Sequence, residues 1–219
     1  MIISRTPFRI SFFGGGTDFP QWYNEHGGKV ISSCINKYCY ISVRELPPFF
    51  KHNYKLRYFE TEEVKKISMI KHPSIRETIK YLNLKNNLEI VHNADLPAQS
   101  GLGASSSFTV GLVNGLVALQ GKRISKKNLA MSALRIEQQK IKEYVGSQDQ
   151  FAASFGGFNI TNFSSNKIEV SPAPTTNKNL NILENSIFLL FSGYPREAQL
   201  LEKKKIDNIK KNSEFLKKI

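Results

Sequence analysis

The sequence predicts an α+β fold, because segments typical of strands and of helices are mixed along it rather than strictly alternating. Its 219 residues suffice for one domain, or one and a half, with a hydrophobic core. Hydrophobic residues make up 40% of the chain, among them fifteen Phe and eight Tyr, as is typical of folded globular proteins. A disordered chain is therefore excluded.

The expected strands lie mostly in the first third and near residue 160. Residues 2–13 are apolar and β-branched but interrupted at Pro7, which predicts one strand or a pair of strands. Residues 29–44 alternate well enough for one long strand or a hairpin. Further strands are expected at residues 53–59, 88–92, 158–162, 167–170 and 187–191.

An apolar helix is expected at residues 104–119, before Gly121. Ser125 is a good N-cap for a second helix over about 127–144. Other helices are expected at residues 19–26, 61–70 and 73–83, and from Glu197 onward.

Several classes of protein do not fit the composition. Two cysteines, Cys34 and Cys39, are too few for a disulfide framework and indicate a reducing compartment. The longest apolar stretch, residues 108–119, is too short to span a bilayer, and the N-terminus lacks the apolar core of a signal peptide. We therefore expect a cytoplasmic protein with no membrane partner.

The chain is basic, with 31 Lys and Arg against 18 Asp and Glu, for a net charge of +13. Such a charge can attract nucleic acid, an anionic surface or an anionic small substrate. The densest block, residues 202–218, alternates lysines with acidic residues, which is typical of a solvated helix face. Since no nucleic-acid motif accompanies it, nucleic acid is not the expected partner.

The strongest functional signal is the run LPAQSGLGASSS at residues 96–107. Its glycines let backbone amides point toward an anion, and the helix expected to follow adds unpaired N–H groups and a positive dipole end. A glycine turn with serine caps is the alternative, but the whole run between a strand and an apolar helix favours phosphate binding. No lysine follows the glycines, so this is not the common Gly-x-x-x-x-Gly-Lys-Ser/Thr loop.

This run resembles the second motif of the galactokinase, homoserine kinase, mevalonate kinase and phosphomevalonate kinase (GHMP kinase) superfamily, Pro-x-x-x-Gly-Leu-Gly-Ser-Ser-Ala. Ala104 stands in place of the first serine and Ser105 in place of the second. Residues 5–20, RTPFRISFFGGGTDFP, resemble the first motif. The Gly-Gly-Gly-Thr-Asp form is most similar to the D-glycero-D-manno-heptose 7-phosphate kinase branch. The resemblance extends from Met1 to about Lys211.

The resemblance implies a ribosomal protein S5 domain 2-like, N-terminal ATP-binding kinase domain over residues 1–170, and the start of a C-terminal region over 171–219. Members usually continue into a ferredoxin-like domain with a third glycine-rich motif, whereas no glycine follows Tyr194 here. We therefore expect that domain to be largely missing, and little or no turnover from these 219 residues alone. An apolar stripe on the C-terminal helix would then favour self-association.

The implied cofactors are ATP and Mg²⁺. The residues expected to contact the nucleotide form the glycine run: Pro97, Ser100, Gly101, Leu102, Gly103, Ala104, Ser105 and Ser106. Ser105 and Glu137, on the helix that follows, are the implied Mg²⁺ ligands, and oxygen ligands completed by water and phosphate suit this ion. Without the resemblance, a glutamate in a charged helix would be expected to face solvent.

The implied catalytic residues are Asp149 and Arg9. Asp149 lies in GSQDQ, residues 146–150, which is similar to the segment that carries the catalytic aspartate in sugar kinases of the superfamily. A carboxylate there can take the proton from the attacking hydroxyl, and Arg9 can pair with it and keep it ionised. On its own, an aspartate in a loop is usually a cap.

The expected substrate-binding residues are Gly15, Gly16, Thr17, Asp18 and Arg196. The glycines allow a substrate to approach the backbone, and Asp18 could accept hydrogen bonds from sugar hydroxyls. A turn with an Asx cap is the alternative for Asp18. Arg196 lies in a segment that resembles Thr-Gly-x-x-Arg-x-Ala of the heptose kinase branch, and an anion contact there is an open question.

The resemblance thus implies an ATP-dependent sugar-phosphate kinase. In the heptose branch the acceptor is the anomeric hydroxyl of D-glycero-D-manno-heptose 7-phosphate. The product is a 1,7-bisphosphate for nucleotide-activated heptose, used in lipopolysaccharide or capsule synthesis. The alternatives are a catalytically weak remnant that binds nucleotide or sugar, a kinase similar to L-fucose kinase, and, least favoured, a nucleic-acid binder.

Overall fold

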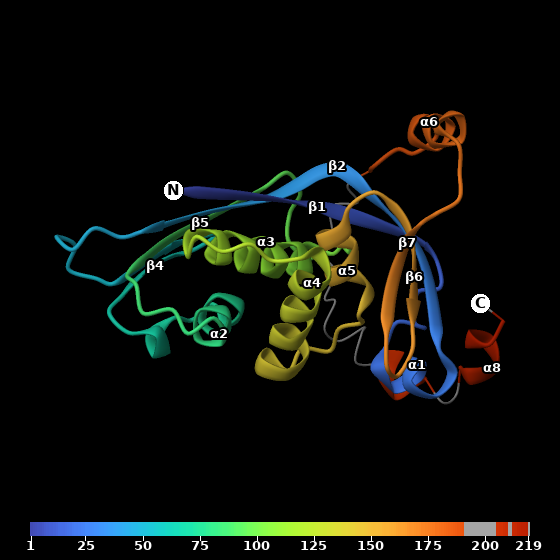
Figure 1. Cartoon of the computed structure of the whole chain (residues 1–219), viewed down its shortest axis with the longest axis horizontal. Helices are drawn as coiled ribbons and strands as arrows, with labels where there is room; N and C mark the ends of the chain where they lie inside the picture. The colour runs from blue at the N-terminus through green and yellow to red at the C-terminus, as the bar shows by residue number, and fades with distance from the viewer. Residues whose placement is uncertain (191–204, 210–211, 219) are drawn as a thin grey trace.

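A computed structural model describes residues 1–190, 205–209 and 212–218, and within them one mixed sheet carries the fold (Figure 1). Its strands are β1 (Ile2–Phe13), β2 (Gly28–Glu45), β3 (Tyr54–Arg57), β4 (Thr61–Val64), β5 (Leu88–Ala94), β6 (Phe158–Phe163) and β7 (Ile168–Pro172). Its helices are α1 (Pro20–His26), α2 (Pro73–Tyr81), α3 (Ala104–Leu119), α4 (Lys126–Arg135), α5 (Gln148–Phe155), α6 (Asn177–Asn185) and α8 (Ser213–Leu216). The expected α+β class is confirmed.

Strand β2 organises the sheet, because it is long enough to pair with three other strands. One edge pairs with β1 from Ile31 to Val43, and the other edge pairs first with β6 and then with β5. The long strand expected at residues 29–44 is therefore one strand and not a hairpin. The register of β1 on β2 shifts between Pro7 and Arg9, a bulge that re-aims the side chains after it.

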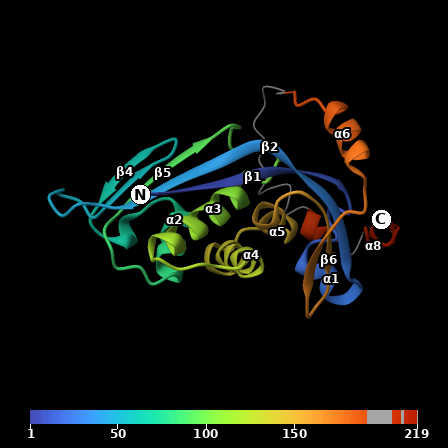
Figure 2. The same cartoon turned by 45° about the horizontal axis from the view of Figure 1, so that its top comes forward.

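Helices α2, α3, α4 and α5 lie on one side of the sheet, and α6 crosses the opposite side (Figures 1 and 2). Helix α3 packs on β1 and β2, and α5 packs on α3 and α4. The main core fills the space between α3, α2 and the sheet, with Phe8, Ile41, Leu56, Ile75, Ile79, Leu88, Ile90, Leu112 and Leu116. This packing fixes α3, and with it the glycine run that precedes it.

Two expected elements were wrong. Residues 61–70 do not form a helix: Thr61–Val64 pairs with β3 as strand β4, and a 3₁₀ turn follows at Ile67–Met69. Pairing within the sheet outweighs local helix propensity there. The strand expected at 187–191 is absent from residues 187–190, and Phe191 lies outside the described residues.

The helix expected over residues 127–144 divides into two parts. Helix α4 ends at Arg135 and continues as a π turn, η2 (Ile136–Ile141), which stops at Lys142 with a φ of 63°. Helices α5 and α6 were not expected from the sequence. Within the part of the chain that the structure describes, no helix is both long and apolar enough to cross a membrane.

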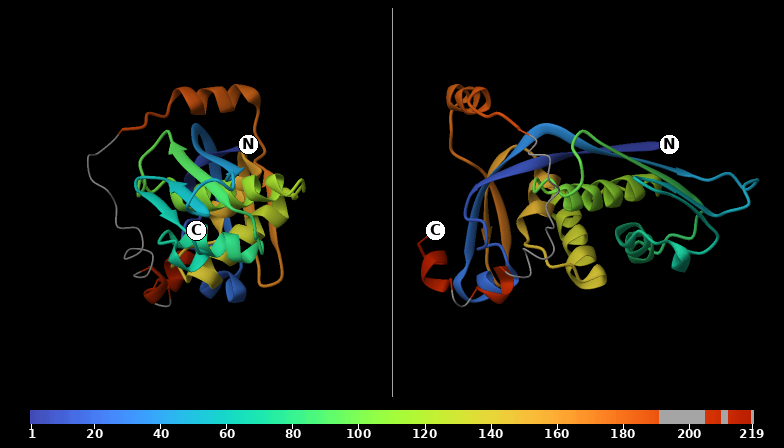
Figure 3. Two further views of the ribbon diagram at one scale, coloured as in Figure 1. Left: turned by 90° about the vertical axis from the view of Figure 1, so that its left-hand side faces the viewer. Right: turned by 180° about the vertical axis from the view of Figure 1, so that it is seen from behind.

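The described C-terminal residues pack beside α1 (Figure 3). Ile209 is 7% exposed and lies in a small apolar cluster with Phe19 and Trp22, which Ile206 and Leu216 also contact. This part of the expected apolar stripe is therefore covered by the chain itself. Self-association through it stays a prediction, as does the domain boundary at residue 170.

Candidate active site

Arg9 and Asp149 form the centre of the candidate site. The Arg9 Nε donates to Asp149 Oδ1 and Nη2 donates to Oδ2, each at 2.7 Å, so the pair is bidentate. Arg9 follows the bulge in β1, and Asp149 is the second residue of α5. The side chains are 13% and 23% exposed, which leaves the pair partly screened from water but still within reach of it. The expected pairing of these two residues is present.

The glycine run passes directly against this pair. Arg9 Nη1 donates to the carbonyl of Gly101, and the Arg9 amide donates to the carbonyl of Leu102. Gly103 caps α3 with a φ of 78°, and a Cβ on it would lie 3.3 Å from Asp149 Oδ2. A side chain at residue 103 would therefore meet the carboxylate as well as strain the backbone. The start of α3, with its unpaired amides, opens beside the carboxylate.

Glu137 is fully buried on the π turn η2 and accepts hydrogen bonds on one carboxylate oxygen. The Ser106 hydroxyl donates to Glu137 Oε2 at 2.9 Å, and the Gln150 amide Nε2 donates to the same oxygen. Burial raises the pKa of Glu137 to about 7. π turns inside helices are frequent at functional sites, and this one holds a carboxylate in the interior.

The serine beside Glu137 differs from the one expected. Ser105 is exposed, and its carbonyl accepts from the Thr109 hydroxyl, whereas Ser106 is buried and contacts Glu137. Successive side chains of a helix point about 100° apart, so a shift of one residue at the start of α3 decides whether the hydroxyl of Ser105 or of Ser106 faces inward. Joint Mg²⁺ ligation by Ser105 and Glu137 stays a prediction, and Ser106 is the hydroxyl in contact with Glu137.

The residues can nevertheless hold a divalent cation. Glu137 Oε1 is buried and has no hydrogen-bond partner among the described residues. No group of three or more His, Cys, Asp or Glu side chains converges anywhere in the described residues. A cation at Glu137 would therefore take much of its shell from phosphate oxygens and water, which suits Mg²⁺.

The first motif is divided between buried and accessible residues. Asp18 is 1% exposed, and its two oxygens accept from the Gly16 and Gln148 amides at 3.1 and 3.2 Å. Thr17 is also buried and donates to the Gly14 carbonyl. Gly15 is exposed and Gly16 half-buried.

Asp18 therefore acts as a brace between the first motif and the start of α5. Burial, and then the nearby Asp149 charge, raise the pKa of Asp18 to about 6. A Cβ on Gly146 would lie 1.9 Å from Asp18 Oδ2, so only glycine lets the chain pass there. Sugar contacts by Thr17 and Asp18, expected from the sequence, stay predictions, since in this arrangement their oxygens bond within the chain. Arg196 lies outside the described residues.

Two glutamines beside Asp149 were missed by the sequence analysis. The amide oxygen of Gln148 accepts from the Ser11 hydroxyl at 2.8 Å, and Gln150 contacts Ser106 and Glu137. Their position on either side of the proposed catalytic aspartate was the available signal. A glutamine lacks the charge by which the other candidates were recognised.

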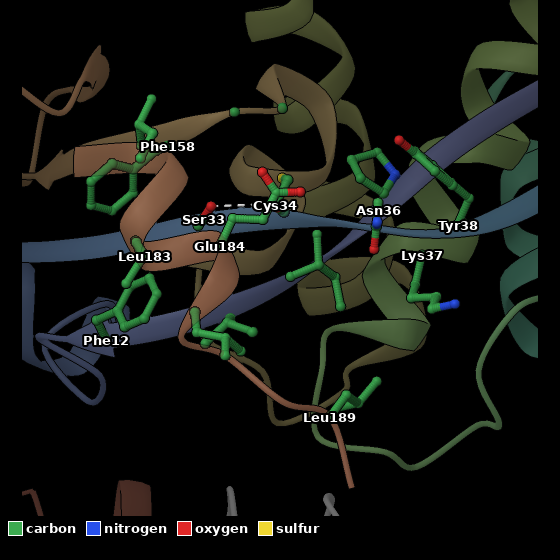
Figure 4. Close-up of a pocket in the computed structure, with 17 residues that line it drawn as sticks. Phe12, Ser33, Cys34, Asn36, Lys37, Tyr38, Phe158, Leu183, Glu184 and Leu189 are labelled. Atoms are coloured by element: carbon green, nitrogen blue, oxygen red, sulfur yellow. Dashed lines mark hydrogen bonds between the residues drawn. The ribbon is translucent and has the colours of Figure 1, made fainter. Parts of the chain in front are cut away.

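A cavity of about 800 Å³ lies elsewhere, between the sheet and α6 (Figure 4). Ile10 and Phe12 of β1 line it, and these side chains alternate with Arg9 and Ser11, which face α5. Leu183 and Glu184 of α6 close its other side. Since none of the residues expected at the site lines this cavity, we place the candidate active site at Arg9 and Asp149.

Comparison with known proteins gives an independent result. Residues 69–157, which include the glycine run, Glu137 and Asp149, match the model of the GHMP kinases N terminal domain. The chain is 29% identical over 214 residues to the D-glycero-alpha-D-manno-heptose 7-phosphate kinase of Campylobacter jejuni. That match covers 93% of this chain and 63% of the relative, so the chain spans under two thirds of its length.

Solved structures of kinases also resemble this chain in fold. The crystal structure of a D-glycero-D-manno-heptose 1-phosphate kinase from Bacteroides thetaiotaomicron has a TM-score of 0.79 and 25% identity, covering 97% of this chain and 72% of that one. The mevalonate kinase of Methanococcus jannaschii, at 18% identity and a TM-score of 0.61, shares the fold over 100% of this chain and 73% of its own. Residues 69–157 thus match the GHMP kinases N terminal domain, and the relatives that resemble most of this chain are described as heptose phosphate and mevalonate kinases.

Proposed function

We propose that this protein is an ATP-dependent kinase of a sugar phosphate, with D-glycero-D-manno-heptose 7-phosphate as the acceptor and its anomeric hydroxyl as the nucleophile. The observation that carries the proposal is the bidentate Arg9–Asp149 pair against Gly103, at the start of α3. A hydroxyl seated there would lie between a carboxylate and a cradle of backbone amides. Phosphoryl transfer requires this kind of positioning and charge neutralisation.

In this proposal Asp149 accepts the proton from the attacking hydroxyl. The two hydrogen bonds from Arg9 fix the orientation of the carboxylate and place a positive charge beside it. The amides from Ser100 to Ser106 bind the phosphates of ATP. Glu137, with Ser105 or Ser106, would hold Mg²⁺, which neutralises phosphate charge when bound. Gly15 and Gly16 line the acceptor side.

The acceptor is supported by the relatives rather than by a contact in this chain. One relative is described as a heptose 7-phosphate kinase and another as a heptose 1-phosphate kinase, so the position of phosphorylation is the part to test. The net charge of +13 suits a donor and an acceptor that are both anionic. A cytoplasmic location and a role in lipopolysaccharide or capsule synthesis complete the proposal.

The test measures ATP consumption and binding with three acceptors: heptose 7-phosphate, heptose 1-phosphate and L-fucose. We expect heptose 7-phosphate to bind best, and any product that the 219 residues form to be a 1,7-bisphosphate, seen as a new anomeric phosphate signal by ³¹P NMR. The control is Asp149→Asn, which should bind ATP but not consume it with any acceptor. A preference for L-fucose or heptose 1-phosphate would refute the proposed acceptor, and failure to bind ATP would refute a kinase.

A further inference from the structure

Gln150 is a fully buried amide that follows the proposed base directly in sequence. The Asp149 side chain points to Arg9, whereas Gln150 points into the interior, toward α3 and the π turn. Its Nε2 donates to Ser106 Oγ at 3.1 Å and to Glu137 Oε2. One side chain from α5 thus joins two other elements that both border the nucleotide side of the proposed site.

These contacts make the two oxygens of Glu137 unequal. Oε2 accepts from both Ser106 Oγ and Gln150 Nε2, whereas Oε1 is buried with no partner among the described residues. A buried carboxylate oxygen without a partner is costly, so the folded chain gains free energy when a donor or cation fills that position. With Oε2 held by two donors, the carboxylate cannot rotate to satisfy Oε1 without breaking a hydrogen bond.

Gln150 suits this role because its amide is neutral. A lysine or arginine at residue 150 would neutralise Glu137 and remove its attraction for a cation. A second carboxylate would repel it. An amide orients the carboxylate by hydrogen bonding and leaves its negative charge available. Partners that hold a ligating side chain in this way usually contribute strongly to metal affinity.

We propose that Gln150 is a positioning residue that fixes the Glu137 carboxylate so that Oε1 is presented to a divalent cation carried by the nucleotide. The inference rests on the proposed function, since it requires a nucleotide–metal complex beside Glu137. It adds that α5 supplies both the proposed base, through Asp149, and the support of the metal carboxylate, through Gln150. It also makes Ser106 a part of this support.

The test measures Mn²⁺ affinity directly by electron paramagnetic resonance, with a non-hydrolysable ATP analogue present. Gln150→Met removes the donor at similar volume, and we expect Mn²⁺ to bind about 10–100-fold more weakly. Nucleotide affinity in EDTA should not change. Ser154→Ala is the matched control, because Ser154 lies one turn further along α5 and its hydroxyl has no partner among the described residues. Gln150→Asn, whose amide is one methylene shorter, serves if the Met variant does not fold.

The outcomes separate this inference from the proposed function. If Glu137→Gln abolishes Mn²⁺ binding and Gln150→Met does not weaken it, the positioning role is wrong and the metal site remains. If Glu137→Gln also leaves Mn²⁺ affinity unchanged, the proposed metal site itself is wrong. Equal losses of nucleotide affinity with and without metal in Gln150→Met would indicate a packing defect and overturn the inference.

Discussion

Replacing Asp18 by Asn should change how stability depends on pH. The Asp18 carboxyl is 1% exposed, and burial, then the nearby Asp149 charge, raise its pKa from the usual 3.8 to about 6. The unfolded chain therefore releases this proton first, and between about pH 4 and 6 the folded state binds more protons than the unfolded state. Under that condition the free energy of unfolding falls as the pH rises.

The size of the effect follows from the two pKa values. A rise from 3.8 to about 6, at about 1.4 kcal/mol per pH unit, corresponds to about 3 kcal/mol. The stabilising contribution is complete below pH 3.8 and lost above about pH 6. The amide that replaces the carboxyl carries no titratable proton. The stability of Asp18→Asn relative to the wild type should therefore rise by most of this amount between about pH 4 and pH 7.

Urea unfolding measured at several pH values tests this prediction. Trp22 is the single tryptophan, is 3% exposed and packs beside Phe19, next to Asp18, so its fluorescence reports unfolding of this region. Asp95→Asn, at an exposed aspartate, is the control for loss of one carboxylate. Parallel curves for wild type and Asp18→Asn over this pH range would refute the reasoning. They would mean that the hydrogen bonds from the Gly16 and Gln148 amides offset the cost of burying the charge.

Three further predictions concern the same region. Gly146→Ala places a Cβ 1.9 Å from Asp18 Oδ2 and should break a hydrogen bond to that carboxylate. We expect the free energy of unfolding in urea to fall by about 1.5–3 kcal/mol. An unchanged midpoint would contradict the proposed role of Asp18 in joining the first motif to α5. Asp149→Asn should lower turnover in a coupled assay by about a hundredfold or more while ATP affinity is retained. Turnover near the wild-type rate would exclude Asp149 as the base. Ile209→Ala should expose Trp22 and increase its quenching by acrylamide, whereas unchanged quenching would mean that the C-terminal cluster does not cover it.

The sequence alone predicts an element correctly where interactions between residues close in the chain determine it. The bounds of α3, Ala104–Leu119, agree with the expected helix, because a glycine precedes it and an apolar run fills it. The pairing of Arg9 with Asp149 could be expected only from the resemblance, since the two lie 140 positions apart and composition does not link them. Strand β4 could not be expected, because its residues follow the pairing offered by β3 rather than their own propensity.

The finer arrangement of the site depends on quantities that a sequence pattern does not contain. Whether Ser105 or Ser106 faces Glu137 is decided by the rotation of α3 about its axis, which the core packing sets. Glu137 continues the buried face of α4, four residues after Ala133, but the apolar pattern does not show which groups receive its carboxylate there. Asp18 was expected to face a sugar, but its burial depends on Gly146 passing close to it.

Helix α5 explains why these features occur together. The backbone N–H of Gln148 donates to Asp18, the side chain of Asp149 pairs with Arg9, and the side chain of Gln150 donates to Glu137. Consecutive side chains of a helix point about 100° apart, so Asp149 and Gln150 can reach separate elements, while the free N–H of the first residue remains available to Asp18. A substitution that shifts the whole of α5 should therefore disturb the first motif, the proposed base and the proposed metal carboxylate together. Because the contacts of Asp149 and Gln150 use different side chains, single substitutions at these two residues can instead separate effects on the proposed base from effects on the proposed metal carboxylate.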